Sequence, residues 1–155
     1  MDELISIDDR VWALIDRYDL HGTPDNPVDL VNLSRLENEF PLVVEDLSAM
    51  EVAGYVIPPH GDISPNNTSP IFVHRTLGPI ARRLTYAHEI GHALHGHAGA
   101  LSLASMDEWF MDRVERDAWI VAAQLLVPVD TMARYETIDA IAAVCMVPRK
   151  LVELA

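Results

Sequence analysis

The sequence predicts an α+β fold, a mostly helical single domain with a small three-stranded sheet packed against a central helix. Three observations predict this class: amphipathic helical periodicity at both ends of the chain, short β-rich runs between them, and a length of 155 residues. Half of the residues are hydrophobic and 23% are charged, which is enough apolar material for a core. We therefore expect one domain over residues 1–155, with residues 129–155 as a C-terminal helical subregion.

Two helices are expected before the sheet. Ser6, with Asp9 three residues later, resembles a capping box, and apolar residues follow at helical spacing, so the first helix should span Ile7–Tyr18. The second should span about Pro27–Glu39, because proline is favoured in the first turn of a helix and apolar residues again recur at helical spacing. Pro41 then ends this helix.

Short runs rich in β-branched and aromatic residues fill the middle of the chain. They are Leu42–Val44, Gly54–Ile57 and Ile71–Val73. The segment between the last two runs is rich in proline, asparagine and glycine, so we expect an exposed loop there. The sequence therefore predicts three strands.

Helices are expected again after the sheet. Pro79 opens a third helix, and Gly96 is a candidate for its C-terminal stop. A fourth helix is expected over about Met106–Val127. Thr137 is expected to cap a fifth helix over Ile138–Met146, and one or two further helical turns should follow it.

Charge and cysteine content narrow the classes of function. The chain has 11 Lys plus Arg against 24 Asp plus Glu, a formal net charge of −13, so we expect no direct contact with nucleic acid or with an anionic membrane. Its one cysteine, Cys145, excludes an intrachain disulfide framework and a cysteine-based zinc finger. The acidic first residues lack the pattern of a signal peptide, and no apolar stretch reaches membrane-spanning length, so we expect a cytoplasmic protein.

One motif carries chemistry. His88-Glu89-Ile90-Gly91-His92 has the pattern H-E-x-x-H and falls inside the third predicted helix. A helix turns by about 100° per residue, so His88 and His92 lie one above the other and both imidazoles can reach one tetrahedral zinc ion. Glu89 points about 100° away, beside the ion, where it can act as the general base on metal-bound water. The alternative interpretation is a solvated helix face that holds no metal.

A catalytic zinc ion needs a third protein ligand. The fourth helix offers Glu115, and Ala118 and Ala122 lie on the same face three and seven residues later. Small residues there let this helix approach Gly91 of the third helix closely and deliver the carboxylate. Two further carboxylates lie near that face, one and two turns earlier, and they remain rival ligands: Asp112 and Glu108.

The region around the motif resembles the ImmA/IrrE family of metallopeptidases. Two segments carry the resemblance, RRLTYAHEIGHALHGH and ERDAWIVAAQLLVP. The family pattern is H-E-x-G-H with a further histidine three residues on, here His95, then E-x-x-A, here beginning at Glu115, and small residues before L-L-x-P. The resemblance covers about residues 25–155 and is strongest over residues 69–128.

This resemblance implies a zincin-like fold and a zinc-dependent endopeptidase. The site it implies has Zn²⁺ bound by His88, His92 and Glu115, with Glu89 as the catalytic base. It also implies a protein substrate, typically a DNA-binding helix-turn-helix repressor of a phage or mobile element, whose inactivation relieves repression of phage, mobile-element or stress genes.

Three positions around the motif need separate interpretation. His95 lies about 20° from His88 around the helix axis, two turns on, and we expect it to have a supporting or structural role. Trp119 stands where the family has Asn or Asp, four residues after the glutamate ligand, which puts a hydrogen bond to a metal ligand in doubt. His74 ends a predicted strand and is a candidate to line the cleft. That strand, near Ile71–His74, is also our candidate for the edge with which an extended peptide pairs.

Two other functions stay open. The departure at Trp119 is compatible with a zinc-containing binding module that inactivates a repressor by contact, without cutting it. A third interpretation is a DNA-binding regulator that uses the C-terminal helix pair. That pair carries only Arg149 and Lys150 as basic residues, which argues against contact with DNA.

Overall fold

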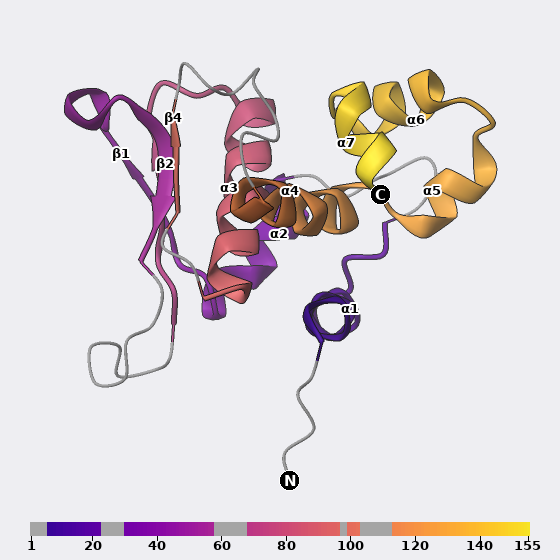
Figure 1. The fold of residues 1–155 in the computed structure, drawn as a ribbon, viewed down its shortest axis with the longest axis horizontal. Helices are drawn as coiled ribbons and strands as arrows, with labels where there is room; N and C mark the ends of the chain where they lie inside the picture. The colour runs from indigo at the N-terminus through magenta and orange to yellow at the C-terminus, as the bar shows by residue number, and fades with distance from the viewer. Residues whose placement is uncertain (1–5, 23–29, 58–67, 97–98, 103–112) are drawn as a thin grey trace, which may run out of the picture.

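A mixed sheet lies on one side of the molecule and the helices gather on the other (Figure 1), which confirms the predicted α+β class. The computed structural model describes residues 6–22, 30–57, 68–96, 99–102 and 113–155. α3 (Pro79–Leu94) packs directly against the sheet, and α4 (Arg113–Leu126) packs against α3. The helix that carries the H-E-x-x-H motif therefore lies between the sheet and a second helix.

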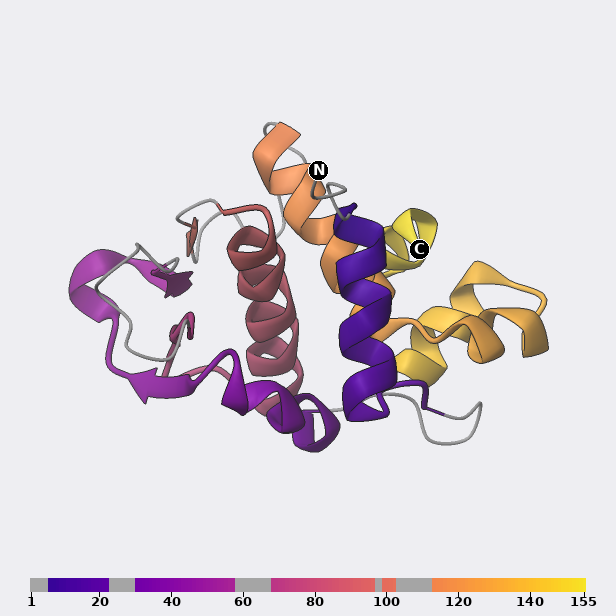
Figure 2. The ribbon, with the colours of Figure 1, turned by 90° about the horizontal axis from the view of Figure 1, so that it is seen from below.

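The helices before the sheet follow the prediction in part. α1 (Ile7–Tyr18) has the predicted bounds, and the Ser6 hydroxyl accepts a hydrogen bond from the Asp9 amide at 3.1 Å. It packs against α4 on the side away from the sheet (Figure 2). α2 (Leu30–Leu33) is short and tightens into the 3-10 helix η1 (Ser34–Asn38), as helices commonly do at their ends. The predicted start of this helix lies outside the described residues.

Four strands form the sheet, in the order β1-β3-β2-β4. β1 (Leu42–Glu45) pairs parallel with β3 (Ile71–His74), and β2 (Val52–Val56) pairs antiparallel with both β3 and β4 (Gly99–Ser102). β4 adds to the three predicted strands. Its sequence, GALS, lacks the β-branched and aromatic residues that are typical of strands. This segment is a strand because its backbone pairs with β2.

The strand order corrects one prediction. We expected the strand near Ile71–His74 to be the free edge of the sheet, but β3 lies between β1 and β2. Among the described residues the edges are β1 and β4. Of these two, β4 is the edge strand that packs against α3.

Three short helices close the chain. α5 (Val129–Arg134) was not predicted, whereas α6 (Ile138–Cys145) and α7 (Arg149–Leu154) match the predicted helices. The Thr137 hydroxyl accepts a hydrogen bond from the Ala140 amide at 3.1 Å, so this residue caps α6 as expected.

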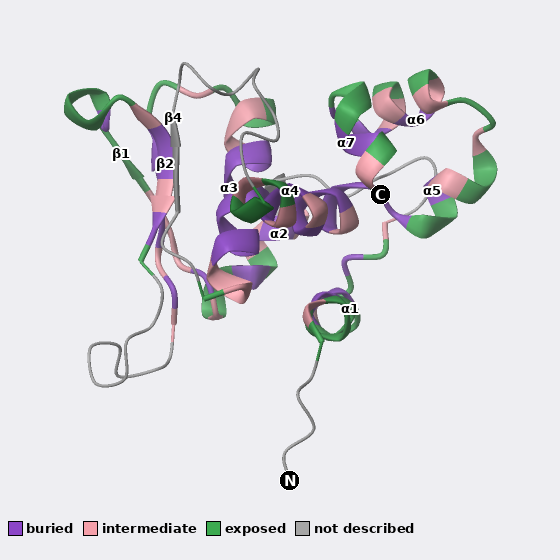
Figure 3. Ribbon diagram, in the orientation of Figure 1, coloured by how far each residue is buried: buried purple, intermediate pink, exposed green. Residues whose placement is uncertain are grey.

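Buried side chains concentrate on α3 and α4, as the purple segments of Figure 3 show. The Tyr86 hydroxyl, buried on α3, donates a hydrogen bond to the Phe40 carbonyl at 2.7 Å and ties the helix to the chain before β1. The buried Arg83 guanidinium donates to the carbonyl oxygens of Cys145 at 2.8 Å and of Met146 at 3.2 Å, where α6 ends. α3 is thus hydrogen-bonded both to the chain before β1 and to the end of α6. No helix within the described residues has the length and apolar character needed to cross a membrane.

Candidate metal centre

α3 and α4 approach each other closely at Gly91. A Cβ atom added to Gly91 would lie 2.7 Å from the Ala118 Cα atom and closer still to the Ala118 carbonyl oxygen, so only glycine permits this backbone contact. Ala118 and Ala122 are fully buried on the facing side of α4. The prediction that small residues bring these two helices together is confirmed.

This approach brings three possible metal-binding side chains together. The Nε2 atoms of His88 and His92 lie 3.1 Å apart. The two carboxylate oxygens of Glu115 lie 3.1 Å from His88 Nε2 and 3.0 Å from His92 Nε2. Adjacent ligand atoms around a tetrahedral zinc ion are separated by about 3.3 Å when the bonds are 2.0–2.1 Å, so the two nitrogens and the carboxylate fit one ion. Both imidazoles are buried, and Glu115 is 26% exposed, so the group reaches the surface through the carboxylate.

The electrostatics of the group favour the protonation states that bind a metal. Burial lowers the pKa of His88, and its hydrogen bond with Glu115 offsets this effect only in part. Burial alone raises the pKa of Glu115, but hydrogen bonds with His88 and His92 and their charges outweigh it and hold the pKa at about 2. A neutral imidazole and a carboxylate are the forms that a divalent metal requires.

The outer nitrogens of the two imidazoles, Nδ1 of His88 and Nδ1 of His92, are buried and have no hydrogen-bond partner among the described residues. The indole ring of Trp119 packs on the His88 ring, with centroids 4.1 Å apart and planes inclined by 40°. Ring packing by Trp119 therefore helps to orient His88, where the family pattern has a polar side chain.

Glu89 lies on a different side of α3 from the three clustered side chains. It is fully buried and faces β2, where its Cγ atom lies 3.7 Å from the position a Cβ of Gly54 would occupy. The Glu89 carboxylate is therefore not one of the clustered ligand atoms. It points away from them around the helix axis, as the helical geometry predicts.

The remaining predicted site residues lie elsewhere. His95 is half-buried and caps the C-terminus of α3, outside the cluster. The rival ligands Asp112 and Glu108 fall outside the described residues.

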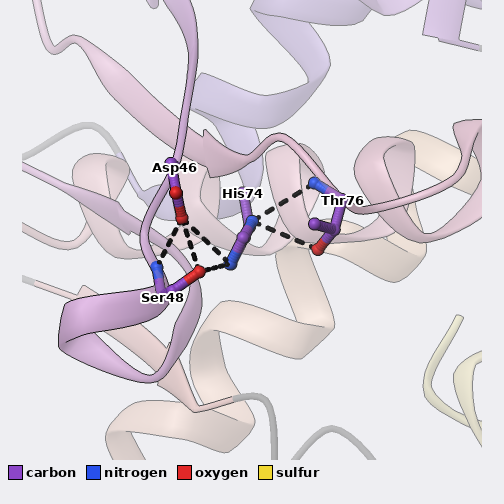
Figure 4. A network of polar contacts seen from close by, with 4 residues as sticks. All are labelled: Asp46, Ser48, His74 and Thr76. Carbon is purple, nitrogen blue, oxygen red and sulfur yellow. Dashed lines mark hydrogen bonds and ion pairs between the residues drawn. The ribbon is translucent and has the colours of Figure 1, made fainter.

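His74 does not line the cleft, which corrects that expectation. Side chains alternate along β3, so His74 points to the sheet face opposite that of Val73, the residue paired with Gly54. There it joins Asp46, Ser48 and Thr76 in a separate polar network (Figure 4). Its Nδ1 accepts from the Thr76 amide at 3.2 Å, so Nε2 carries the proton and faces Ser48 Oγ at 3.4 Å.

Two residues near Glu89 were not predicted from the sequence. Gly54 lets β2 approach α3, and Thr85 lies beneath it, one helical turn before Glu89. A glycine inside an otherwise β-rich run marks a bulge or a close backbone approach, and this was the available signal.

The comparison with protein families agrees with the geometry. The model of a peptidase family, described as IrrE N-terminal-like domain, matches residues 39–152. The match includes both α3 and α4, the two helices that carry the clustered side chains. No curated protein matches the chain.

Proposed function

The chain belongs to the IrrE N-terminal-like family of metallopeptidases, and from this premise we propose that it is a zinc-dependent endopeptidase that cleaves a helix-turn-helix repressor or a similar regulatory protein. One observation carries the proposal. The two imidazole nitrogens lie 3.1 Å apart, and each lies 3.0–3.1 Å from one oxygen of the Glu115 carboxylate, an arrangement that fits a single ion.

The residues divide into two roles. His88, His92 and Glu115 would hold the zinc ion, which polarises a scissile carbonyl and acidifies a bound water when it is present. Glu89 would accept the proton of the attacking water on its carboxylate and transfer it to the leaving amine nitrogen. Glu89 is fully buried, which supports a proton transfer shielded from bulk water.

The sheet offers a place for the substrate backbone. β4 is an edge strand that packs against α3, and an extended peptide can add to such an edge by main-chain hydrogen bonds. We therefore move the proposed pairing edge from β3 to β4. The substrate's scissile bond would then run along the side of the sheet on which Glu89 and the metal cluster lie.

Charge supports a basic protein partner. The chain has a formal net charge of −13, and a DNA-binding repressor presents a basic surface that an acidic protein attracts. In this proposal the chain acts as one domain in the cytoplasm, where such repressors bind DNA, and it does not itself bind nucleic acid or membrane.

One observation favours a second function. Trp119 replaces the polar side chain of the family pattern, and the outer nitrogens of both histidines lack hydrogen-bond partners among the described residues. A zinc ion whose histidine ligands lack such partners is expected to activate its bound water less. The alternative is a binding module that inactivates the repressor by contact alone.

Co-expression with a candidate repressor separates the two functions. Each helix-turn-helix repressor encoded beside the gene is expressed with wild type or with Glu89→Gln, together with a reporter under that repressor's control. A peptidase gives a cleaved repressor and an active reporter with wild type only, because the variant lacks the general base. Full derepression by Glu89→Gln with an intact repressor would refute the peptidase and establish inactivation by contact.

A further inference from the structure

α3 is held on two sides by two different close contacts. Gly91 faces the backbone of α4 at Ala118, and this contact brings Glu115 to the histidines. Thr85 and Glu89, one helical turn apart, face β2 at Gly54. The group that fits a metal and the buried carboxylate of Glu89 are therefore set by separate neighbours of the same helix.

No side chain fits at Gly54. A Cβ there would lie 2.6 Å from Thr85 Cγ2 and 2.8 Å from the Phe72 carbonyl oxygen, well below an ordinary contact of 3.4 Å. Thr85 cannot rotate its methyl group away freely, because its hydroxyl donates a hydrogen bond to the Ala81 carbonyl at 2.8 Å. Any larger residue at position 54 must therefore move β2, α3 or both.

Gly54 also lies at an irregularity of the sheet. The register of β2 against β4 shifts between Val52 and Gly54, which is the signature of a β-bulge. Ala53 and Gly54 are both buried, whereas neighbouring residues of a regular strand point to opposite faces. Bulges are frequent beside active sites, where they redirect the chain or a side chain. Here the bulge lies between the edge strand β4 and the helix face that carries Glu89.

We infer that Gly54, together with Thr85, is a positioning residue that fixes the carboxylate of Glu89 at its working distance from the metal cluster. This inference rests on the proposed function, in which Glu89 is the general base. Gly54 touches neither metal nor substrate in this account; it acts through Glu89. The same bulge also fixes the position of β4 relative to Glu89. The proposed general base and the proposed substrate-pairing strand are therefore both positioned by β2 at Gly54.

The size of the contact sets the expected effect. Alanine at position 54 requires a displacement of about 0.8 Å at Thr85 to restore an ordinary contact of 3.4 Å. A general base works over a range of about 2.6–3.2 Å from the atom that carries the proton, which is narrower than this displacement. A local shift of that size at Thr85 and Glu89 takes the Glu89 carboxylate out of range. The backbone contact between Gly91 and Ala118 is expected to keep the two histidines in place against Glu115.

Binding of two small ligands to the cobalt-loaded protein tests this inference without a substrate. Acetohydroxamate chelates the metal and gives up a proton, and a carboxylate in range strengthens binding by accepting it, whereas thiocyanate binds as an anion and transfers none. Visible absorption of bound Co²⁺ reports both affinities. The variants are Gly54→Ala and Thr85→Ser, with Glu89→Gln as the reference for loss of the base. Gly78→Ala is the matched control, because a Cβ at Gly78 meets nothing within 4 Å.

We expect Gly54→Ala to bind Co²⁺ and thiocyanate within about threefold of wild type and acetohydroxamate at least about tenfold more weakly, as Glu89→Gln does. Thr85→Ser keeps the hydroxyl and loses the methyl group, so it should fold and show a smaller loss in the same direction. It decides the question if Gly54→Ala does not fold.

Three outcomes overturn the inference. The first is acetohydroxamate binding by Gly54→Ala as tight as that of wild type, or by Thr85→Ser if only that variant folds. If Glu89→Gln binds acetohydroxamate more weakly in the same experiment, the proposed function stands and only the role of Gly54 is refuted. Loss of Co²⁺ binding in folded Gly54→Ala shows that the contact supports the whole helix rather than Glu89. Equal acetohydroxamate binding by wild type and Glu89→Gln removes Glu89 as the base, and the proposed function fails with it.

Discussion

Replacing Gly91 by alanine should separate the third candidate ligand from the other two. The new methyl group would lie 2.7 Å from the Ala118 Cα atom, and restoring an ordinary contact of 3.4 Å requires α3 and α4 to move apart by about 0.7 Å or more. Glu115 lies on α4 one turn before Ala118, so its carboxylate moves with that backbone. His88 and His92 stay with α3.

This displacement is large on the scale of a metal site. Zinc–ligand distances are held within about 0.2 Å, and the Glu115 oxygens lie only 3.0 and 3.1 Å from the two imidazole nitrogens. We expect the affinity for zinc to fall by about 10–100-fold. Overpacking of this helix contact should also lower the free energy of unfolding by about 1–3 kcal/mol.

Competition against a chromophoric zinc chelator measures the affinity, and urea denaturation of the metal-free protein measures the stability. Gly78→Ala is the control, because its added methyl group meets nothing within 4 Å. Ala118→Gly should not rescue Gly91→Ala, because the atoms that obstruct the new methyl group belong to the backbone of residue 118.

A folded Gly91→Ala variant that binds zinc within about twofold of wild type would contradict this prediction. Such a result would show either that the helices adjust without moving Glu115 or that Glu115 is not a ligand. Rescue by Ala118→Gly would show that the obstruction is not the backbone contact described above.

Three further predictions concern Arg83, Cys145 and Glu115. Arg83→Met should lower the free energy of unfolding by about 2–3 kcal/mol in urea denaturation, because two carbonyl oxygens at the end of α6 lose a charged donor; a change below about 0.5 kcal/mol would contradict this. Burial raises the pKa of the Cys145 thiol, so iodoacetamide at pH 8 should modify it only after denaturation, and rapid labelling of native protein would show that it is accessible. The Glu115 pKa of about 2 lies below the ordinary value, so its contribution to stability is present above about pH 4.5 and is lost as the pH falls towards 2. The metal-free wild type should lose more stability over that range than Glu115→Gln, and parallel profiles would contradict the lowered pKa.

The motif-bearing helix and its partner could be predicted because each of their signals is local. Pro79 opens α3, the spacing of His88 and His92 sets one face, and Ala118 and Ala122 mark the face of α4 that approaches it. Such spacings depend only on the helical repeat. Local spacings in the sequence are therefore sufficient to predict that α3 pairs with α4.

The sheet was harder to predict because its order depends on pairing between distant segments. β3 is rich in β-branched and aromatic residues and was predicted as a strand, but nothing in its own sequence shows that strands pair on both sides of it. The role of Gly54 depends on Thr85, which lies 31 positions later in the chain. Two of the residues that contact His74, Asp46 and Ser48, are likewise distant from it in the sequence.

Zinc content after saturation and gel filtration measures directly whether His88, His92 and Glu115 bind the metal. Wild type, Glu115→Gln and the double variant His88→Ala/His92→Ala are incubated with excess zinc, separated from free metal and analysed for zinc per chain. We expect one zinc per chain in wild type, strongly reduced zinc in Glu115→Gln, and none in the double variant. Near-stoichiometric zinc in the double variant would contradict the account, because the metal would then be bound elsewhere.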